Sequence, residues 1–221
     1  QYPHRGNPIL PEYDKFYVDK TYYTSDNQEL RSKNNQYKKD FFLADKLIEM
    51  LENRVNTKNF FYVNKAGTHE PFEMSYPEDQ KIFKPTLSKN VTFSTWEKTS
   101  NSYYNSIRWN VDEFFKYLIK KTDKFQNLLI IYTSDHGSHL VRESRFNKNK
   151  GINDESLFAN VPLFIIYSKI NEYLFEQLQS SINLNKNKLS HFEIFPTLLL
   201  LFGYNEKLIN QYYGKTIFQK I

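Results

Sequence analysis

The segment that most constrains the fold is an unbroken apolar run, Leu128-Leu-Ile-Ile-Tyr132, that leads into Asp135-His136-Gly137. A run of β-branched and apolar residues with no polar break is typical of a central strand in a sheet that is covered on both faces. Open α/β folds place their chemistry at the carboxyl ends of such strands. We therefore expect a functional site directly after this strand.

Asp135 and His136 bring two kinds of metal ligand to adjacent positions. The aspartate offers a hard oxygen and the histidine a borderline nitrogen, a combination that suits Zn²⁺ and also Mn²⁺. Gly137 permits the sharp turn that such a site needs. In the alternative interpretation the triplet only closes a turn, with Asp135 capping the next segment. These three residues leave both interpretations open.

The rest of the chain predicts an α/β fold in one domain over residues 1–221, with a largely parallel sheet flanked by helices. Residues 1–36 are expected to be irregular covering structure. Apolar periodicity predicts helices over Tyr37–Asn53, Thr99–Lys121, Asn171–Ser180 and Ser190–Gly203, and buried strands over Asn59–Asn64 and Val161–Tyr167. The predicted apolar stripe of the second helix is Tyr104, Ile107, Val111, Phe114, Phe115 and Leu118. Pro196 is expected to kink or split the last helix.

Composition excludes several classes of protein. Aromatic residues make up 17% of the 221 residues, which is ample for a core and argues against disorder. The absence of cysteine excludes disulfides and thiolate metal sites. The net charge of +5 is scattered, and without a basic stripe interleaved with aromatic residues it argues against nucleic-acid binding. A basic surface does suit anionic lipid headgroups or phosphorylated substrates.

Several motifs, taken together and in order, resemble the sulfatase-like branch of the alkaline phosphatase superfamily. The closest resemblance is to the phosphoethanolamine transferases that modify bacterial lipopolysaccharide. The segment Lys65-Ala66-Gly67-Thr68-His69-Glu70-Pro71-Phe72 is similar to that group's Gly-x-His-x-Pro segment. The resemblance covers about residues 40 to 203, and its other motifs are Asn105–Phe115, Tyr132–Gly137, Val161–Leu163 and Phe195–Leu199.

The resemblance implies an alkaline phosphatase-like enzyme that transfers a phosphoryl or sulfuryl group through a covalent intermediate on a Thr or Ser held at a metal. Asp135 and His136 match the family's carboxyl-terminal pair of metal ligands. His69 matches a catalytic and substrate-binding histidine, able to bind phosphate or to protonate the leaving alkoxide. Lys65 is a weaker substrate-binding candidate, as a point charge for phosphate. Local hydrogen bonding for His69 and a plain surface position for Lys65 are the alternatives.

The other histidines are weaker candidates. His191 follows the expected N-cap Ser190, which favours a capping or structural role over metal ligation. His139 lies three residues after His136, but it matches the family poorly. We expect no functional role for His4.

The chain departs from the family pattern in two ways, and these departures limit what the resemblance implies about its catalytic site. The family's first metal carboxylate and its nucleophile lie before the matched region, so the chain is expected to be the carboxyl-terminal part of a catalytic domain that lacks its amino-terminal part. Family members usually carry a further histidine before the Val-Pro-Leu strand. Gly151–Asn160 contains none, which puts a second metal in doubt.

The parent protein is therefore expected to be a metal-dependent phosphoethanolamine transferase, with zinc preferred and manganese as the alternative. Its substrate would be a phospholipid or a lipopolysaccharide-type molecule, and upstream helices would hold it at the periplasmic face of the bacterial inner membrane. One alternative is a phosphohydrolase or sulfatase of the same superfamily. Another is a catalytically dead module that binds a phosphorylated headgroup or a partner protein.

The first prediction concerns this chain expressed by itself. We expect little or no transferase activity, because two ligands hold a metal weakly and the covalent route needs a nucleophile. Turnover of a phosphodiester by the purified chain, with and without added Zn²⁺ or Mn²⁺, is the measurement. Metal-dependent turnover would contradict the expectation.

Overall fold

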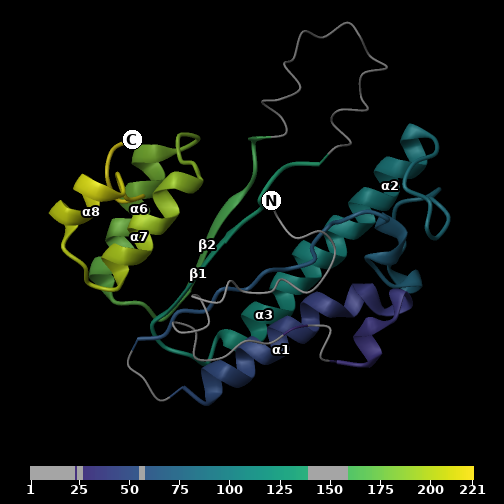
Figure 1. Ribbon diagram of the computed structural model, residues 1–221, viewed down its shortest axis with the longest axis horizontal. Helices are drawn as coiled ribbons and strands as arrows, with labels where there is room; N and C mark the ends of the chain where they lie inside the picture. The colour runs from purple at the N-terminus through teal and green to yellow at the C-terminus, as the bar shows by residue number, and fades with distance from the viewer. Residues whose placement is uncertain (1–22, 24–26, 55–57, 139–158) are drawn as a thin grey trace, which may run out of the picture. The chain divides into compact units, whose positions relative to one another are not determined.

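The computed structural model describes residue 23 and residues 27–54, 58–138 and 159–221. The chain divides into two compact units, residues 1–123 and residues 124–221, which we call the amino-terminal and carboxyl-terminal units (Figure 1). Each unit is described by itself. The single domain expected over residues 1–221 stays a prediction, and most of the irregular segment expected over residues 1–36 lies outside the described residues.

The amino-terminal unit is helical in the described residues. Its elements are the 3₁₀ helices η3 (Glu29–Arg31), η4 (Lys33–Lys38), η5 (Phe72–Met74) and η6 (Glu78–Gln80), the α-helices α1 (Lys39–Glu52), α2 (Trp96–Ile107) and α3 (Phe114–Thr122), and the π-helical segment η7 (Arg108–Glu113). The predicted helices over Tyr37–Asn53 and Thr99–Lys121 are thereby confirmed, with small differences at their ends. None of the helices in the described parts of the chain is long and apolar enough to cross a bilayer.

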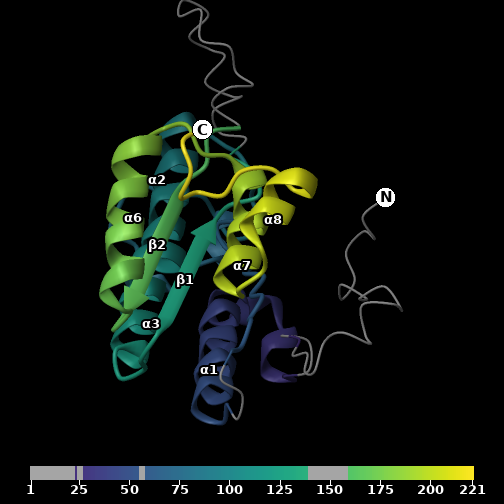
Figure 2. The same cartoon turned by 90° about the vertical axis from the view of Figure 1, so that its left-hand side faces the viewer.

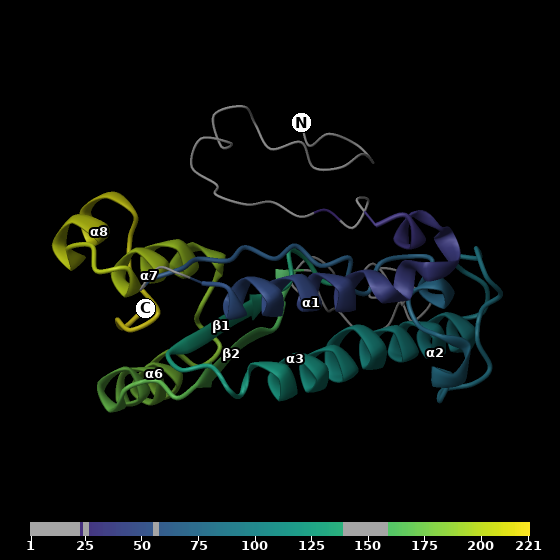
Figure 3. The ribbon, with the colours of Figure 1, turned by 90° about the horizontal axis from the view of Figure 1, so that it is seen from below.

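Helix α1 packs along α3, as Figure 3 shows. Its buried residues Asp40, Ala44, Ile48 and Leu51 recur at helical spacing and form one face. Phe41 adds a ring contact to α3, with its centroid 6.0 Å from that of Phe114. This buried face is apolar except at its first residue, Asp40, which carries a carboxylate.

The second long helix runs from α2 through η7 to α3. Its predicted apolar stripe is confirmed at Phe114, Phe115 and Leu118, which are buried, but not in the first half of the helix. Tyr104 is half exposed, whereas small polar side chains are buried along the first half of this helix: Thr99, Ser102, Asn105, Ser106 and Asn110. The physical reason is that a loop lies against this face and its backbone needs partners. Asn105 Oδ1 accepts from the amides of Ile82 and Phe83 at 3.0 Å each.

The predicted buried strand over Asn59–Asn64 is wrong. Within the described residues this segment is extended but belongs to no sheet, and Phe60 and Tyr62 are 57% and 81% exposed. Periodicity by itself does not separate a buried strand from an apolar segment that leads into a loop. The segment here leads directly into the loop that begins at Lys65.

The carboxyl-terminal unit contains β1 (Leu128–Thr133) and β2 (Leu163–Ser168), which pair antiparallel from Leu128↔Ser168 to Thr133↔Leu163 (Figure 2). Both strands lie close to where the sequence predicts them. β1 is half-buried along its length rather than fully covered, since its only described neighbour in the sheet is β2. The described residues thus contain one antiparallel pair, and the largely parallel sheet stays a prediction.

Helices follow β2 as predicted, with one addition. They are α6 (Glu172–Asn185), the 3₁₀ helix η9 (His191–Glu193), α7 (Ile194–Leu201) and α8 (Glu206–Tyr212), of which α8 was not predicted. Ser190 forms a capping box with Glu193, and Gly203 has the positive φ of +91° expected after a helix end. Pro196 falls in the first turn of α7, where its missing N–H removes no helical hydrogen bond.

The second prediction concerns Asn185, which is 1% exposed at the end of α6. Its amide donates to the carbonyls of Ile217 and Gln219 at 2.9 and 2.6 Å, and its Oδ1 accepts from Ile221 N at 3.1 Å. Asn185→Ala leaves these backbone groups without their partner, so we expect a loss of about 2 kcal/mol or more in the free energy of unfolding. Urea denaturation measures it.

The matched control is Asn183→Ala, an exposed position on the same helix. Its unfolding free energy should stay within about 0.5 kcal/mol of the wild type. Equal effects of the two substitutions would contradict the role given to Asn185.

Candidate functional site

The predicted metal ligands lie side by side after β1. His136 Nε2 is 3.7 Å from Asp135 Oδ2, and the side chains are 46% and 87% exposed. Two ligand atoms on one tetrahedral Zn²⁺ lie about 3.4 Å apart, given metal–ligand distances of about 2.0–2.1 Å. The observed separation is therefore close to what a shared ion requires.

The backbone around the pair orients both side chains. His136 Nδ1 lies 2.7 Å from the carbonyl of Gly137, so in the neutral ring Nδ1 carries the proton and Nε2 has the lone pair. A ligating histidine in proteins commonly donates its other ring N–H in this way. Asp135 Oδ1 accepts from the amide of His136 at 3.0 Å, which leaves Oδ2 facing the imidazole. The donor atoms present thus fit two ligands of a divalent cation site.

His191 approaches the same strand end. Its Nε2 lies 3.0 Å from the hydroxyl Oγ1 of Thr133, the last residue of β1. Capping of the following helix falls to Ser190, whose hydroxyl accepts from the Phe192 amide. His191 thus ties the start of η9 to the end of β1, two residues before Asp135.

No third ligand joins the pair in the part of the chain that the structure describes. Across those residues, no three His, Cys, Asp or Glu side chains gather in a way that could hold a metal ion. His139 and His4 lie outside the described residues, as do residues 151–158 of the segment that lacks the family's further histidine.

The second candidate site, in the amino-terminal unit, is the loop from Lys65 to Phe72, held at its start by Asp40. The Asp40 carboxylate is 1% exposed and accepts from Lys65 Nζ at 2.8 Å, from Ala66 N at 2.8 Å and from Gly67 N at 3.0 Å. Lys65 Nζ also donates to the Asn110 carbonyl at 2.9 Å. Burial lowers the pKa of the Lys65 ammonium below its usual range, and the charge of Asp40 opposes that shift. The predicted role of Lys65 in binding phosphate stays a prediction.

Further hydrogen bonds continue from the lysine to His69. Asn110 lies in η7, and its Nδ2 donates to the carbonyl of Ser75 at 2.9 Å. Ser75 Oγ in turn donates to the carbonyl of His69 at 3.0 Å. The main chain around His69 is thus held on both sides. Before His69, the Asp40 carboxylate binds the amides of Ala66 and Gly67, and at His69 itself the Ser75 hydroxyl binds the carbonyl.

The His69 ring itself is exposed. Its Nδ1 lies 2.7 Å from the carbonyl of Glu70, so in the neutral ring Nδ1 carries the proton and Nε2 is the acceptor. This local hydrogen bond was one alternative for His69, and the structure shows it. The bond fixes the tautomer and leaves Nε2 as the atom that can take up a proton.

The far end of the loop is held by a second buried carboxylate, Glu73. It is 3% exposed, accepts from the Ser102 hydroxyl at 2.6 Å and from the Tyr76 hydroxyl, and lies 3.0 Å from Lys81 Nζ. Sequence analysis missed both Asp40 and Glu73. A signal exists for Asp40, because it lies four residues before Ala44 on the apolar face of α1.

The structure therefore describes one candidate site in each unit. In the carboxyl-terminal unit the side chains of Asp135 and His136 lie close together. In the amino-terminal unit Lys65 and His69 lie on the same loop, and Asp40 binds the Lys65 ammonium and the amide of Gly67.

Comparison with known proteins assigns the family. The model of the family described as Sulfatase matches residues 10–204, which is most of the chain. This chain belongs to the sulfatase family. The resemblance stated from the motifs is thereby confirmed, and the family implies an alkaline phosphatase-like α/β fold. Enzymes of this superfamily are metal-dependent in general.

Among curated proteins, the chain is similar to "Phosphoethanolamine transferase EptA" of Helicobacter pylori, with 28% identity over 159 residues. The match covers 69% of this sulfatase-family chain and 30% of that relative, so the chain spans less than a third of the relative's length. No solved structure matches the chain. The comparisons support a sulfatase-like or phosphoethanolamine transferase-like function in general terms.

The third prediction concerns metal binding after β1. Asp135→Ala should abolish zinc binding, because it removes one of the two adjacent ligands, while the free energy of unfolding changes by less than about 1 kcal/mol at this exposed position. Titration calorimetry with Zn²⁺ and urea denaturation measure the two effects in the full-length protein. Asp79→Ala, an exposed aspartate in the other unit, is the control.

Two results would oppose this assignment. Zinc binding that survives Asp135→Ala unchanged would remove the carboxylate from the site. Unfolding by Asp135→Ala, in a protein that never binds metal, would favour the turn-capping alternative.

Proposed function

We propose that this chain is part of the catalytic domain of a metal-dependent enzyme that transfers phosphoethanolamine from a phospholipid to a lipopolysaccharide-type acceptor. The observation that carries the proposal is the Asp135–His136 pair, oriented by its own backbone at the end of β1 in a sulfatase-family chain. The similarity to the Helicobacter pylori transferase supports phosphoethanolamine as the transferred group.

Asp135 Oδ2 and His136 Nε2 are the atoms proposed to hold the cation, and their oxygen–nitrogen donor set favours zinc, with manganese as the alternative. A divalent cation bound there supplies positive charge that neutralises the oxygens of a phosphoryl group and lowers the pKa of a coordinated hydroxyl nucleophile. The chain's own contribution is to keep the imidazole in the tautomer that presents Nε2.

His69 is proposed to handle the proton of the leaving group. An imidazole can both accept and donate a proton through its ring nitrogens. With Nδ1 bonded to the Glu70 carbonyl, the added proton resides on Nε2, which can donate it to a phosphate oxygen or to the alkoxide that leaves the donor lipid. This role requires that His69 and the cation at Asp135 and His136 act on the same substrate, which is part of the proposal.

The setting follows from the same proposal. A phospholipid donor and a lipopolysaccharide-type acceptor place the reaction at a membrane surface, and we propose the periplasmic face of the bacterial inner membrane. The net charge of +5 suits contact with anionic lipid headgroups.

The fourth prediction tests the function with the full-length protein, phosphatidylethanolamine vesicles and a lipid A acceptor. Mass spectrometry should detect acceptor that gains one phosphoethanolamine group, and chelation should stop the reaction. His69→Ala should lower kcat by about 10²- to 10⁴-fold, the range for loss of a general acid. Thr68→Ala, its neighbour in the loop, should keep kcat within about threefold because it removes no proton donor.

Unmodified acceptor under all metal conditions would overturn the proposed function. Equal activity of the His69→Ala variant and the wild type would overturn the role of the histidine while leaving the transfer itself standing.

Hydrolysis of a sulfate or phosphate ester is the second candidate, and the Sulfatase description of the matching family favours it. The two candidates differ in the acceptor, because hydrolysis uses water. Release of sulfate or phosphate from soluble aryl esters, without modification of lipid A, would select the hydrolase.

A further inference from the structure

Asp40 is buried against the loop that carries His69, and the roles proposed for His69, Asp135 and His136 do not account for it. This carboxylate lies in the first turn of α1, where the helix dipole favours a negative charge. It accepts three hydrogen bonds, from the Lys65 ammonium and from the amides of Ala66 and Gly67. Two of these donors are backbone groups, located three and two residues before His69.

Lys65 completes the arrangement from the opposite side. Its ammonium lies 3.3 Å from the ring centroid of Phe114 and donates to the Asn110 carbonyl, and its side chain is 10% exposed. A charge pair in such surroundings is tolerated only with well-aligned partners, because each charge has lost most of its hydration. The geometry of Asp40, Lys65 and the loop is therefore sharply defined.

The amides of Ala66 and Gly67 lie where the backbone conformation after Lys65 is unusual. Gly67 has a φ of +60°, a conformation that L side chains rarely adopt, and the chain bends at the next residue, Thr68. Asp40 Oδ2 holds the Gly67 amide at 3.0 Å while Oδ1 holds the Ala66 amide at 2.8 Å. The direction in which the chain leaves this turn determines where the His69 ring lies.

We infer that Asp40 and Lys65 form a buried clamp that positions His69 for phosphoryl transfer. The inference rests on the proposed function, and it makes Asp40 a positioning residue that never touches substrate. It also gives Lys65 a structural assignment in place of direct contact with the phosphate. A shift of about 1 Å in a reacting group can lower a rate about 100-fold, so a clamp of this kind affects kcat more than substrate affinity.

The same unit offers a matched control. Asn105 is also 1% exposed and also holds a loop by its backbone, with bonds to the amides of Ile82 and Phe83 and to the Phe83 carbonyl. Its loop does not carry His69. If Asp40 served stability only, variants of Asp40 and Asn105 with equal losses in Tm would have equal effects on catalysis.

The experiment uses steady-state kinetics of the full-length protein with phosphatidylethanolamine vesicles and a lipid A acceptor. We expect Asp40→Asn to lower kcat by about 10- to 100-fold while KM changes by less than about threefold, and Asn105→Ala to leave kcat within about threefold. The double variant Asp40→Asn/Lys65→Met removes the stranded ammonium, so it should recover Tm without recovering kcat. Wild-type kcat in Asp40→Asn, or equal losses in the Asp40 and Asn105 variants, would overturn the clamp.

Hydrogen exchange provides a readout that needs no activity. In the wild type the amides of Ala66 and Gly67 should be protected, and Asp40→Ala should speed their exchange by about 10-fold or more without affecting Ile82 and Phe83. Asn105→Ala should give the reverse pattern. A wild type without transferase activity would count against the proposed function, whereas unprotected amides at Ala66 and Gly67 in the wild type would count against the clamp, even where the Asp40 variants do not fold.

Discussion

The buried carboxylate of Asp40 is the contact on which the candidate site of the amino-terminal unit depends. A charge that is 1% exposed requires compensating donors, and here they come from the loop that carries His69. The need for donors thus couples the first turn of α1 to the loop. Asn110 extends the coupling through η7, a π-helical segment of the kind often found at functional sites.

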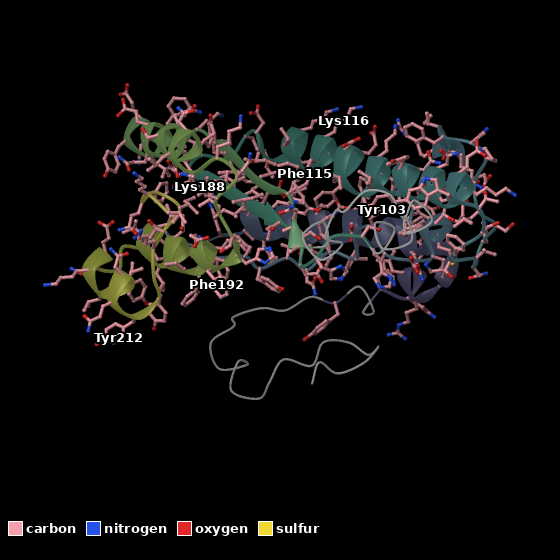
Figure 4. The ribbon with its side chains drawn as sticks, turned by 90° about the horizontal axis from the view of Figure 1, so that it is seen from above. Tyr103, Phe115, Lys116, Lys188, Phe192 and Tyr212 are labelled. Carbon is pink, nitrogen blue, oxygen red and sulfur yellow. The ribbon has the colours of Figure 1, made fainter. Side chains whose placement is uncertain are left out.

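The two units hold their candidate site residues in place in different ways. In the amino-terminal unit, buried side chains hold loop backbone, as Asp40, Glu73 and Asn105 do. In the carboxyl-terminal unit, local backbone bonds orient exposed side chains, as Gly137 does for His136. Aromatic side chains such as Phe192 and Tyr212 are 84% and 68% exposed in that unit, and Figure 4 labels both. In each unit the candidate side chains are thus exposed while the groups that hold them are fixed by hydrogen bonds.

Several parts of this picture could be predicted from the sequence because they depend on local patterns. The apolar run from Leu128 predicted a strand, and Ser190 was expected to be the N-cap of a helix. Both predictions are confirmed. The side chains of Asp135 and His136 also lie close together, because these residues follow the end of β1, whereas neighbouring residues within a strand point to opposite faces.

Other features depend on long-range contacts, which local patterns do not encode. The polar buried face of α2 exists because a loop about 20 residues away lies on it, with Asn105 bonded to Ile82. Whether Asn59–Asn64 forms a strand depends on the presence of a neighbouring strand to pair with, and the periodicity of the segment does not reveal such a partner. The role of Asp40 was not predicted, because it depends on contacts with Lys65 and with the amides of Ala66 and Gly67, which are distant in the sequence. The long helices and the two paired strands were therefore predictable, whereas the structure of residues 59–64, helix α8 and the hydrogen bonds that hold the site were not.

The most direct test of the account is a crystal structure of the full-length protein with zinc and an uncleavable phosphoethanolamine donor, with data collected at the zinc absorption edge. The account predicts an anomalous peak bound by Asp135 and His136, and His69 Nε2 within about 3.2 Å of the leaving oxygen or a phosphate oxygen. Zinc bound without either residue, or a donor phosphate out of reach of His69, would contradict it.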